Sequence, residues 1–141
     1  SLFGKSNDEA KYIITGNKRD VNRYKWNYKN ISKKLDNKNS KQSIFFQKIS
    51  NLLSVRRKQK AFHPNASRHI INLGSKIFSF KRISIDKKQT IICITNLSSK
   101  IQRANLNKIY HNWKNLIGSK IEIKNKFLIL KPFETIWLSN I

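Results

Sequence analysis

The sequence predicts an α+β chain in which one amphipathic helix precedes a small antiparallel β domain. Two patterns in the sequence predict this class. Apolar residues recur at three- and four-residue steps between residues 40 and 60, whereas from about residue 69 the period changes to two. The chain has 141 residues, 38% of them hydrophobic, which suffices for one domain with a modest core or for parts of two.

Residues 1 to about 40 show no sustained periodicity, and they combine many asparagines with Gly4 and Gly16. This composition predicts a long loop with short ordered pieces. A loop of this length inside a compact domain is usually functional or disordered. Its aromatic residues indicate that part of it packs against something; they are Phe3, Tyr12, Tyr24, Trp26 and Tyr28.

Residues 40–60 form the clearest predicted helix. Asn39 and Gln42 are spaced for a capping box, and Pro64 stops the helix. A single amphipathic helix needs a partner surface, and the first forty residues supply little of one, so we expect its apolar face to be exposed. The apolar stripe recurs at helical spacing and comprises Phe45, Ile49, Leu52, Leu53 and Arg56.

The remainder of the chain reads as an antiparallel all-β domain. Strands are predicted within 76–85 and 90–96, where β-branched and aromatic residues alternate or predominate. The stretch 119–139 predicts a short strand, a turn at Asn125 and two further strands separated by Pro132.

The net charge of +23 and the pI near 10.5 ordinarily indicate a nucleic acid or an anionic membrane surface as partner. Here, however, 23 lysines, 21 isoleucines and 17 asparagines share A/T-rich codons, and the basic residues are spread along the whole chain. Mutational drift toward A and T explains such a charge without selection for a polyanion. We therefore expect no nucleic-acid partner, and a small basic nucleic-acid-binding protein remains the alternative.

Segments for export or membrane insertion are not evident. The beginning does not read as a signal peptide, and no apolar run approaches the length that spans a bilayer. The single cysteine, Cys93, lies in an apolar run and reads as a buried residue in a reducing compartment, so we expect a cytoplasmic protein without membrane contact. Because the sequence contains no methionine, we expect a chain that was trimmed or cut out of something longer.

The residues offer no catalytic constellation of their own. No metal-ligand spacing, Gly-rich phosphate loop or nucleophile elbow is present, so we predict no catalytic residue, no metal and no cofactor. The histidines are scattered at His63, His69 and His111. The acids number seven: Asp8, Glu9, Asp20, Asp36, Asp86, Glu122 and Glu134.

One short stretch, GNKRDVNRYKW (16–26), nevertheless suggests an anion site. Lysine outnumbers arginine 23 to 7 in the chain, yet Arg19 and Arg23 both flank Asp20 here. Arginine is a planar fork that binds phosphate or carboxylate at two points, whereas lysine is a flexible point charge. The alternative is that these arginines are surface charges or bind backbone carbonyls.

Four stretches in order resemble the end of sucrose-phosphorylase-type enzymes, which are retaining (β/α)8-barrel enzymes of the α-amylase superfamily. They are SLFGKSND (1–8), TGNKRDVNRYKW (15–26), LLSVRRKQKAFHPNAS (52–67) and LILKPFETIWLSN (128–140). The resemblance implies that residues 1–63 are the tail of a catalytic barrel, with the loop after strand 8 and the terminal helix. Residues 64–141 are then the C-terminal antiparallel β domain, with Phe62 between the two domains.

The resemblance also implies a chemistry. Such enzymes move a glucosyl unit from sucrose or a related α-glucoside to inorganic phosphate through a covalent glucosyl-carboxylate. Loops at the C-terminal ends of barrel strands build the active site, which places the arginines at its mouth. The implied phosphate and substrate contacts are Arg23 first and Arg19 second, with Asp20 holding an arginine, Asn22 binding sugar hydroxyls, and Tyr24 or Trp26 walling the site.

The catalytic carboxylates of such enzymes lie on earlier barrel strands, and those strands are missing here. We therefore expect this chain to be inactive alone, with a sugar, inorganic phosphate and the missing barrel portion as partners of the parent enzyme. A third hypothesis is a structural or carbohydrate-surface β module, suggested only by the aromatic residues.

Overall fold

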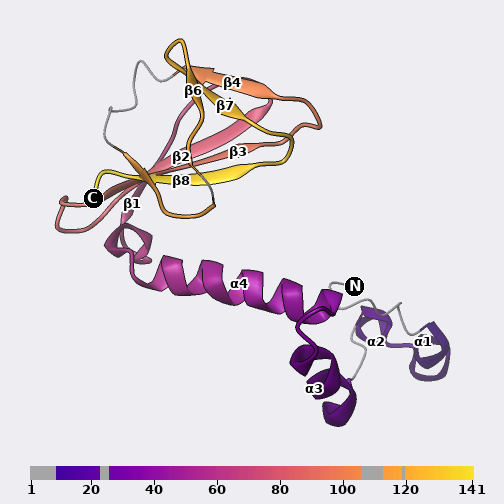
Figure 1. Ribbon diagram of the computed structural model, residues 1–141. Helices are drawn as coiled ribbons and strands as arrows, with labels where there is room; N and C mark the ends of the chain where they lie inside the picture. The colour runs from indigo at the N-terminus through magenta and orange to yellow at the C-terminus, as the bar shows by residue number, and fades with distance from the viewer. Residues whose placement is uncertain (1–8, 23–25, 106–112, 119) are drawn as a thin grey trace. The chain divides into compact units, whose positions relative to one another are not determined.

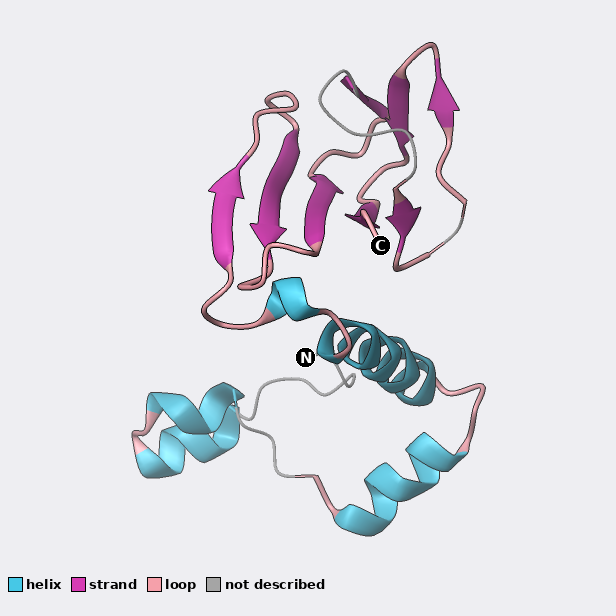
Figure 2. Ribbon diagram, turned by 90° about the vertical axis from the view of Figure 1, so that its left-hand side faces the viewer, coloured by secondary structure: helices cyan, strands magenta, loops and turns pink. Residues whose placement is uncertain are grey.

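The computed structural model describes all residues except 1–8, 23–25, 106–112 and 119. The chain divides into two compact units, Ser1–Asn51 and Leu52–Ile141. Helices occupy the first part of the sequence, and strands begin at Ser67 (Figures 1 and 2). The predicted α+β class with antiparallel sheets is confirmed.

The first unit is more helical than the sequence pattern predicted. Helices α1 (Glu9–Thr15), α2 (Lys18–Asn22) and α3 (Tyr28–Asp36) lie within the stretch that the sequence analysis interpreted as a loop. The reason is local capping by asparagine: Asn27 begins α3, and its side chain accepts a hydrogen bond from the Asn30 N–H. These helices are the short ordered pieces expected within residues 1–40, but they occupy most of its described residues, so the interpretation of this stretch as mainly a loop was wrong.

Helix α4 (Lys41–Arg57) matches the predicted helix, although its cap differs. Ser40, not Asn39, caps the helix, because the Ser43 N–H donates to the Ser40 hydroxyl at 3.0 Å. Ser43 is the only residue of α4 that is fully buried, whereas Ile49, Leu52 and Leu53 are exposed. The expected exposure of an apolar helix face is confirmed.

The second unit begins with the short 3₁₀ helix η1 (Lys60–Phe62) and continues as strands. Its five-stranded sheet has the order β1-β2-β3-β8-β5, and every pair in it is antiparallel. The strands are β1 (Ser67–Ile70), β2 (Ile77–Ile83), β3 (Thr90–Asn96), β5 (Lys114–Asn115) and β8 (Thr135–Ser139). The final strand thus lies inside this sheet, between β3 and β5.

A three-stranded sheet has the order β4-β7-β6. Its strands are β4 (Gln102–Asn105), β6 (Ile123–Lys124) and β7 (Phe127–Leu130). Asn125 and Lys126 join β6 to β7, both with positive φ (49° and 67°), which is the two-residue turn that suits a hairpin. The predicted turn at Asn125 and the separation of β7 from β8 at Pro132 are confirmed.

The main hydrophobic core lies between these two sheets. The five-stranded sheet contributes Ile77, Ile92, Ile94, Ile136 and Leu138, and the three-stranded sheet contributes Ala104, Leu128 and Leu130. A second cluster forms on the opposite side of the five-stranded sheet, around Ala61, Ile91 and Cys93. Within the described residues, no helix is long and apolar enough to span a membrane.

Candidate functional site

The arginine motif begins at a tight turn between α1 and α2. Gly16 has a φ of 62°, and its N–H donates to the Tyr12 carbonyl at 2.8 Å, which ends α1. The side chain of Asn17 then accepts a hydrogen bond from the Arg19 N–H at 3.0 Å and begins α2. Two consecutive capping residues therefore fix the chain direction immediately before Arg19.

Asp20 is held by two residues of α1. The Thr15 hydroxyl donates to one carboxylate oxygen of Asp20 at 2.8 Å, and the Lys11 ammonium lies 3.5 Å from the other. The carboxylate is therefore a structural anchor of α2 on α1. Sequence reasoning missed Lys11 as a contributor, because it lies across the turn at Gly16 from the motif.

The described residues include only part of the predicted phosphate site. Arg19 is exposed on α2, beside the partly buried Asp20, and Asn22 is the last residue of that helix. Arg23 and Tyr24 lie outside the described residues. Their assignment to phosphate and to the wall of the site stays a prediction, as does an arginine contact of Asp20.

Side-chain hydrogen bonds tie the segment 59–66 to the strands of the second unit, which we call the β unit. Arg82 donates from its guanidinium to the carbonyls of Ala61 at 2.9 Å and His63 at 2.6 Å. The Gln89 side chain accepts from the Ala61 N–H at 3.0 Å. Phe62 lies with its ring centroid 4.8 Å from that of Trp137. These contacts hold η1, which lies within this segment, against the five-stranded sheet.

Asp86, at an exposed position after β2, makes a further contact with Lys60 of η1. The Ser84 hydroxyl donates to it at 2.6 Å, the Lys60 ammonium at 3.0 Å and the Lys88 N–H at 3.2 Å. These hydrogen bonds, above all the one from Ser84, hold the pKa of Asp86 well below its usual range. An acid that stays ionised in this way suits an ion pair and does not suit proton donation.

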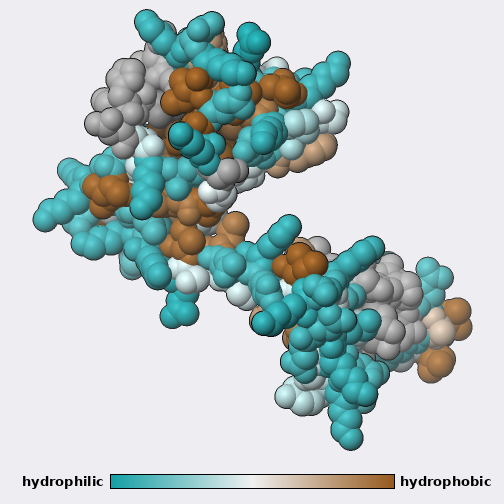
Figure 3. All heavy atoms as spheres, viewed as in Figure 1, coloured by the Kyte–Doolittle hydropathy of each residue, from teal (hydrophilic) through white to brown (hydrophobic). Residues whose placement is uncertain are grey.

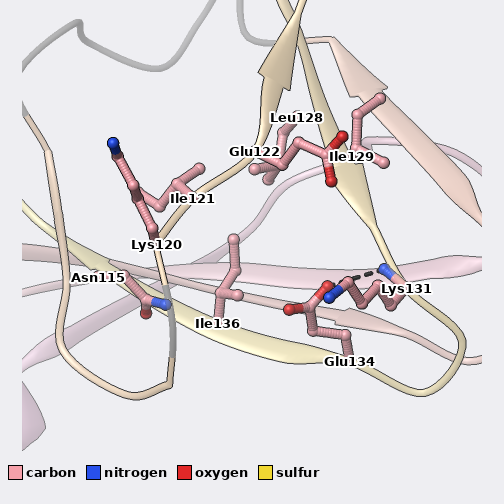
Figure 4. Close-up of a pocket in the computed structure, with 9 residues that line it drawn as sticks. All are labelled: Asn115, Lys120, Ile121, Glu122, Leu128, Ile129, Lys131, Glu134 and Ile136. Atoms are coloured by element: carbon pink, nitrogen blue, oxygen red, sulfur yellow. Dashed lines mark hydrogen bonds between the residues drawn. The ribbon is translucent and has the colours of Figure 1, made fainter.

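A small cavity of about 100 Å³ opens in the β unit (Figure 4). Two of its acids are already engaged, since Glu134 accepts the Lys131 N–H at 2.7 Å and Glu122 lies 3.0 Å from the Lys124 ammonium. Among the described residues, no three of the His, Cys, Asp and Glu side chains lie together as metal ligands. The cavity lining comprises Asn115, Lys120, Ile121, Glu122, Leu128, Ile129, Lys131, Glu134 and Ile136.

Comparison with known proteins relates the whole chain to one group of enzymes. This chain is 27% identical over 141 aligned positions to the glucosylglycerate phosphorylase of Escherichia coli K12, and the alignment covers 98% of this chain and 24% of that enzyme. It is 30% identical over 98 positions to the glucosylglycerate phosphorylase of Spirochaeta thermophila, covering 70% of this chain and 17% of that one. No family model matches the chain.

The chain corresponds to the C-terminal part of a phosphorylase-like enzyme. The resemblance drawn from the four sequence stretches is thereby confirmed. The chain spans about a quarter of the length of the E. coli relative.

Solved structures of other enzymes share the fold of this chain. The α-glucosyl transfer enzyme XgtA matches with a TM-score of 0.58 at 16% identity, covering 77% of this chain and 19% of that one. The trehalulose synthase MutB matches with a TM-score of 0.57 at 17% identity and the same coverage. At these identities the match supports the arrangement of elements and carries no statement about substrate.

Proposed function

We propose that this chain is the C-terminal part of a retaining phosphorylase that transfers a glucosyl unit from an α-glucoside to inorganic phosphate. The observation that carries the proposal is the match to glucosylglycerate phosphorylases along 98% of the chain. The donor is glucosylglycerate, sucrose or a related α-glucoside. Residues 1–63 form the end of the catalytic barrel in this proposal, and 64–141 form the β domain that follows it.

Within that enzyme, the arginine motif binds phosphate at the mouth of the active site. Arg23 is the first contact and Arg19 the second, because a guanidinium grips two phosphate oxygens at once and orients the dianion beside the glucosyl-carboxylate. The capped turn at Gly16 supports this role, since it holds the start of α2 in one direction. Asn22 binds sugar hydroxyls, and Tyr24 forms part of the wall.

The chain alone is inactive in this proposal. A retaining mechanism needs a carboxylate nucleophile and a carboxylic acid about 5–5.5 Å apart. Four acids of the described residues already have other partners: Asp20, Asp86, Glu122 and Glu134 each contact a lysine, a hydroxyl or a backbone N–H. In this proposal the nucleophile and the acid come from the barrel strands that such an enzyme carries before this region.

The DNA upstream of the coding region tests this assignment. We expect it to encode the remainder of a barrel, with its catalytic carboxylates, in frame or just out of frame. An unrelated gene or a promoter immediately upstream would contradict the proposal.

A restored enzyme tests the phosphate site. It is made by joining this chain to the part of E. coli glucosylglycerate phosphorylase that the chain does not match, and phosphorolysis is assayed at varied phosphate concentrations. Arg23→Lys keeps the charge and loses the fork, so we expect the KM for phosphate to rise about tenfold. Arg103→Lys, at an exposed position of β4, is the matched control. Equal KM values for both variants would remove Arg23 from the phosphate site.

A further inference from the structure

The hydroxyl of Thr15 joins the two helices on either side of Gly16. Thr15 is the last residue of α1, and its hydroxyl donates to the Asp20 carboxylate of α2 at 2.8 Å. The same oxygen accepts a hydrogen bond from the Asn17 N–H at 3.3 Å. Asn17 caps the start of α2, since its side chain accepts from the Arg19 N–H. One hydroxyl therefore holds α2 at two points, its capping residue and Asp20, and two points fix the direction of a short helix.

The Asp20 carboxylate is the stronger of two acceptors for the Thr15 proton. The Lys11 carbonyl also lies 3.0 Å from the Thr15 hydroxyl, but a hydroxyl has only one proton to donate. A charged acceptor at the shorter distance binds that proton more strongly. The Lys11 ammonium lies 3.5 Å from the other carboxylate oxygen, so α1 contacts both oxygens of Asp20.

Apolar packing contributes little to the joint between α1 and α2. No residue of α1 is buried, and Ile13 and Ile14 are 81% and 84% exposed. Apolar atoms accordingly lie at the surface over α1 in Figure 3. Among the described residues, hydrogen bonds and the ion pair with Lys11 therefore attach α2 to α1 in place of a shared apolar core.

We propose that Thr15 is a positioning residue for the phosphate site, and that its hydroxyl determines how well phosphate competes with water for the glucosyl group. The inference rests on the proposed function, in which Arg19 and Arg23 bind phosphate. Arg19 lies next to Asp20 on α2. Arg23 directly follows the last residue of that helix in the sequence. A change in the direction of α2 therefore displaces Arg19 and the start of the segment that carries Arg23.

Phosphate and water react with the same glucosyl-carboxylate in this proposal. When phosphate reacts, one of its oxygens bonds to the anomeric carbon, the bond to the enzyme carboxylate breaks and returns its electron pair to that carboxylate, and glucosyl phosphate is released. When water reacts, its oxygen forms the new bond, its proton passes to the acid/base carboxylate, and glucose is released. Phosphate held away from the anomeric carbon reacts more slowly, whereas water does not need the arginines. The ratio of glucosyl phosphate to glucose therefore reports the position of phosphate, and it does not depend on how much of the enzyme is folded.

The restored enzyme tests this role with glucosylglycerate as donor and phosphate below its KM, and both products are quantified by chromatography. We expect Thr15→Val, which removes the hydroxyl and keeps the shape, to lower the ratio of glucosyl phosphate to glucose about fivefold. Thr15→Ser keeps the hydroxyl and should stay within about twofold of the original ratio. Thr135→Val is the matched control and should also stay within about twofold, because Thr135 is likewise exposed and its hydroxyl bonds only across the β unit, to Thr95 at 3.1 Å.

The outcomes separate this inference from the proposed function. An unchanged ratio in Thr15→Val, or an equal fall in Thr15→Ser, would overturn the role of the hydroxyl and leave the proposed function standing. If a thermal melt shows that Thr15→Val does not fold, Lys11→Gln replaces it, because Lys11 also contacts the Asp20 carboxylate, and an unchanged ratio there would overturn the inference in the same way. A restored enzyme that carries the original chain and melts cooperatively, yet forms no glucosyl phosphate, would count against the proposed function itself.

Discussion

Replacement of Asn96 by alanine is the most informative test of how the β unit is held together. Asn96 ends β3 and is fully buried. Its amide nitrogen donates to the carbonyls of Lys100 at 2.7 Å and Lys131 at 2.9 Å, and its oxygen accepts from the N–H and the hydroxyl of Ser98. One side chain thus ties the turn after β3 to the connection between β7 and β8.

The expected loss follows from these contacts. Four partly buried hydrogen bonds of 2.7–2.9 Å disappear when the Asn96 side chain is removed. At about 1 kcal/mol for each bond, the free energy of unfolding of Asn96→Ala falls by about 4 kcal/mol. Domains are typically stable by about 5–15 kcal/mol, so this variant is expected to lie close to unfolding.

Asn96→Asp separates the hydrogen bonds from the shape of the side chain. It keeps an acceptor for Ser98 but removes both donors, and a carboxylate oxygen then faces the carbonyls of Lys100 and Lys131. This repulsion favours the protonated form in the folded state and raises the pKa of the introduced carboxyl above its unfolded value. Stability of this variant is therefore expected to fall as the pH rises above about 4.

Urea denaturation of the full chain, followed by far-UV circular dichroism, measures these changes. Asn140→Ala is the matched control, because Asn140 is exposed and also makes two hydrogen bonds, accepting from the Thr90 N–H and donating to the Lys88 carbonyl. Its loss is expected to stay below about 1 kcal/mol. If Asn96→Ala loses no more than this control, the reasoning about the buried network is refuted.

Three further outcomes follow from single side chains of the β unit. Asp86→Asn should lower the urea midpoint at pH 7, because the pKa of Asp86 is lowered in the folded state and its ionised carboxyl therefore stabilises the fold. The difference in midpoint from the original chain should shrink as the pH falls below about 4 and the carboxyl becomes protonated. A difference that is constant with pH would contradict this. Burial raises the pKa of Cys93 to about 12. The folded chain should therefore react with a thiol reagent at least a hundredfold more slowly than the urea-unfolded chain. Equal reaction rates would show that the reagent reaches β3 in the folded chain. Phe133 has a φ of 55° in the turn between β7 and β8, a conformation that glycine adopts without strain. Phe133→Gly should therefore raise the free energy of unfolding by about 0.5 kcal/mol and with it the urea midpoint. A lowered midpoint would show that packing of the Phe133 ring stabilises the fold.

The β unit was largely predictable because its signals are local. Alternation of period two, β-branched runs and a turn at Asn125 each act within a few residues, and the strands formed where these signals lie. The pairing of β3 with β8 was not predictable in the same way. Those strands are about forty residues apart, and their register is set by which side chains fill the space between the sheets.

The helices of the first unit were missed for a different reason. Each is short, so apolar periodicity has little length over which to develop, and their asparagines were interpreted as turn formers. Asn17 and Asn27 are in fact capping residues that start helices. Asparagine is favoured both in turns and at the first position of a helix, so its presence alone does not separate the two.

The candidate site was likewise only partly predictable from the sequence. The contrast between scarce arginine and abundant lysine pointed to the groups suited to an anion, and that signal lies in residue identity alone. The groups that orient the motif are of another kind: Lys11 and Thr15 contact Asp20 across the turn at Gly16. A spacing of five and nine residues matches neither helix nor strand, so only the observed turn brings them together. Residue identity therefore gave the residues predicted to face an anion, whereas the direction of α2 depends on a backbone reversal at Gly16.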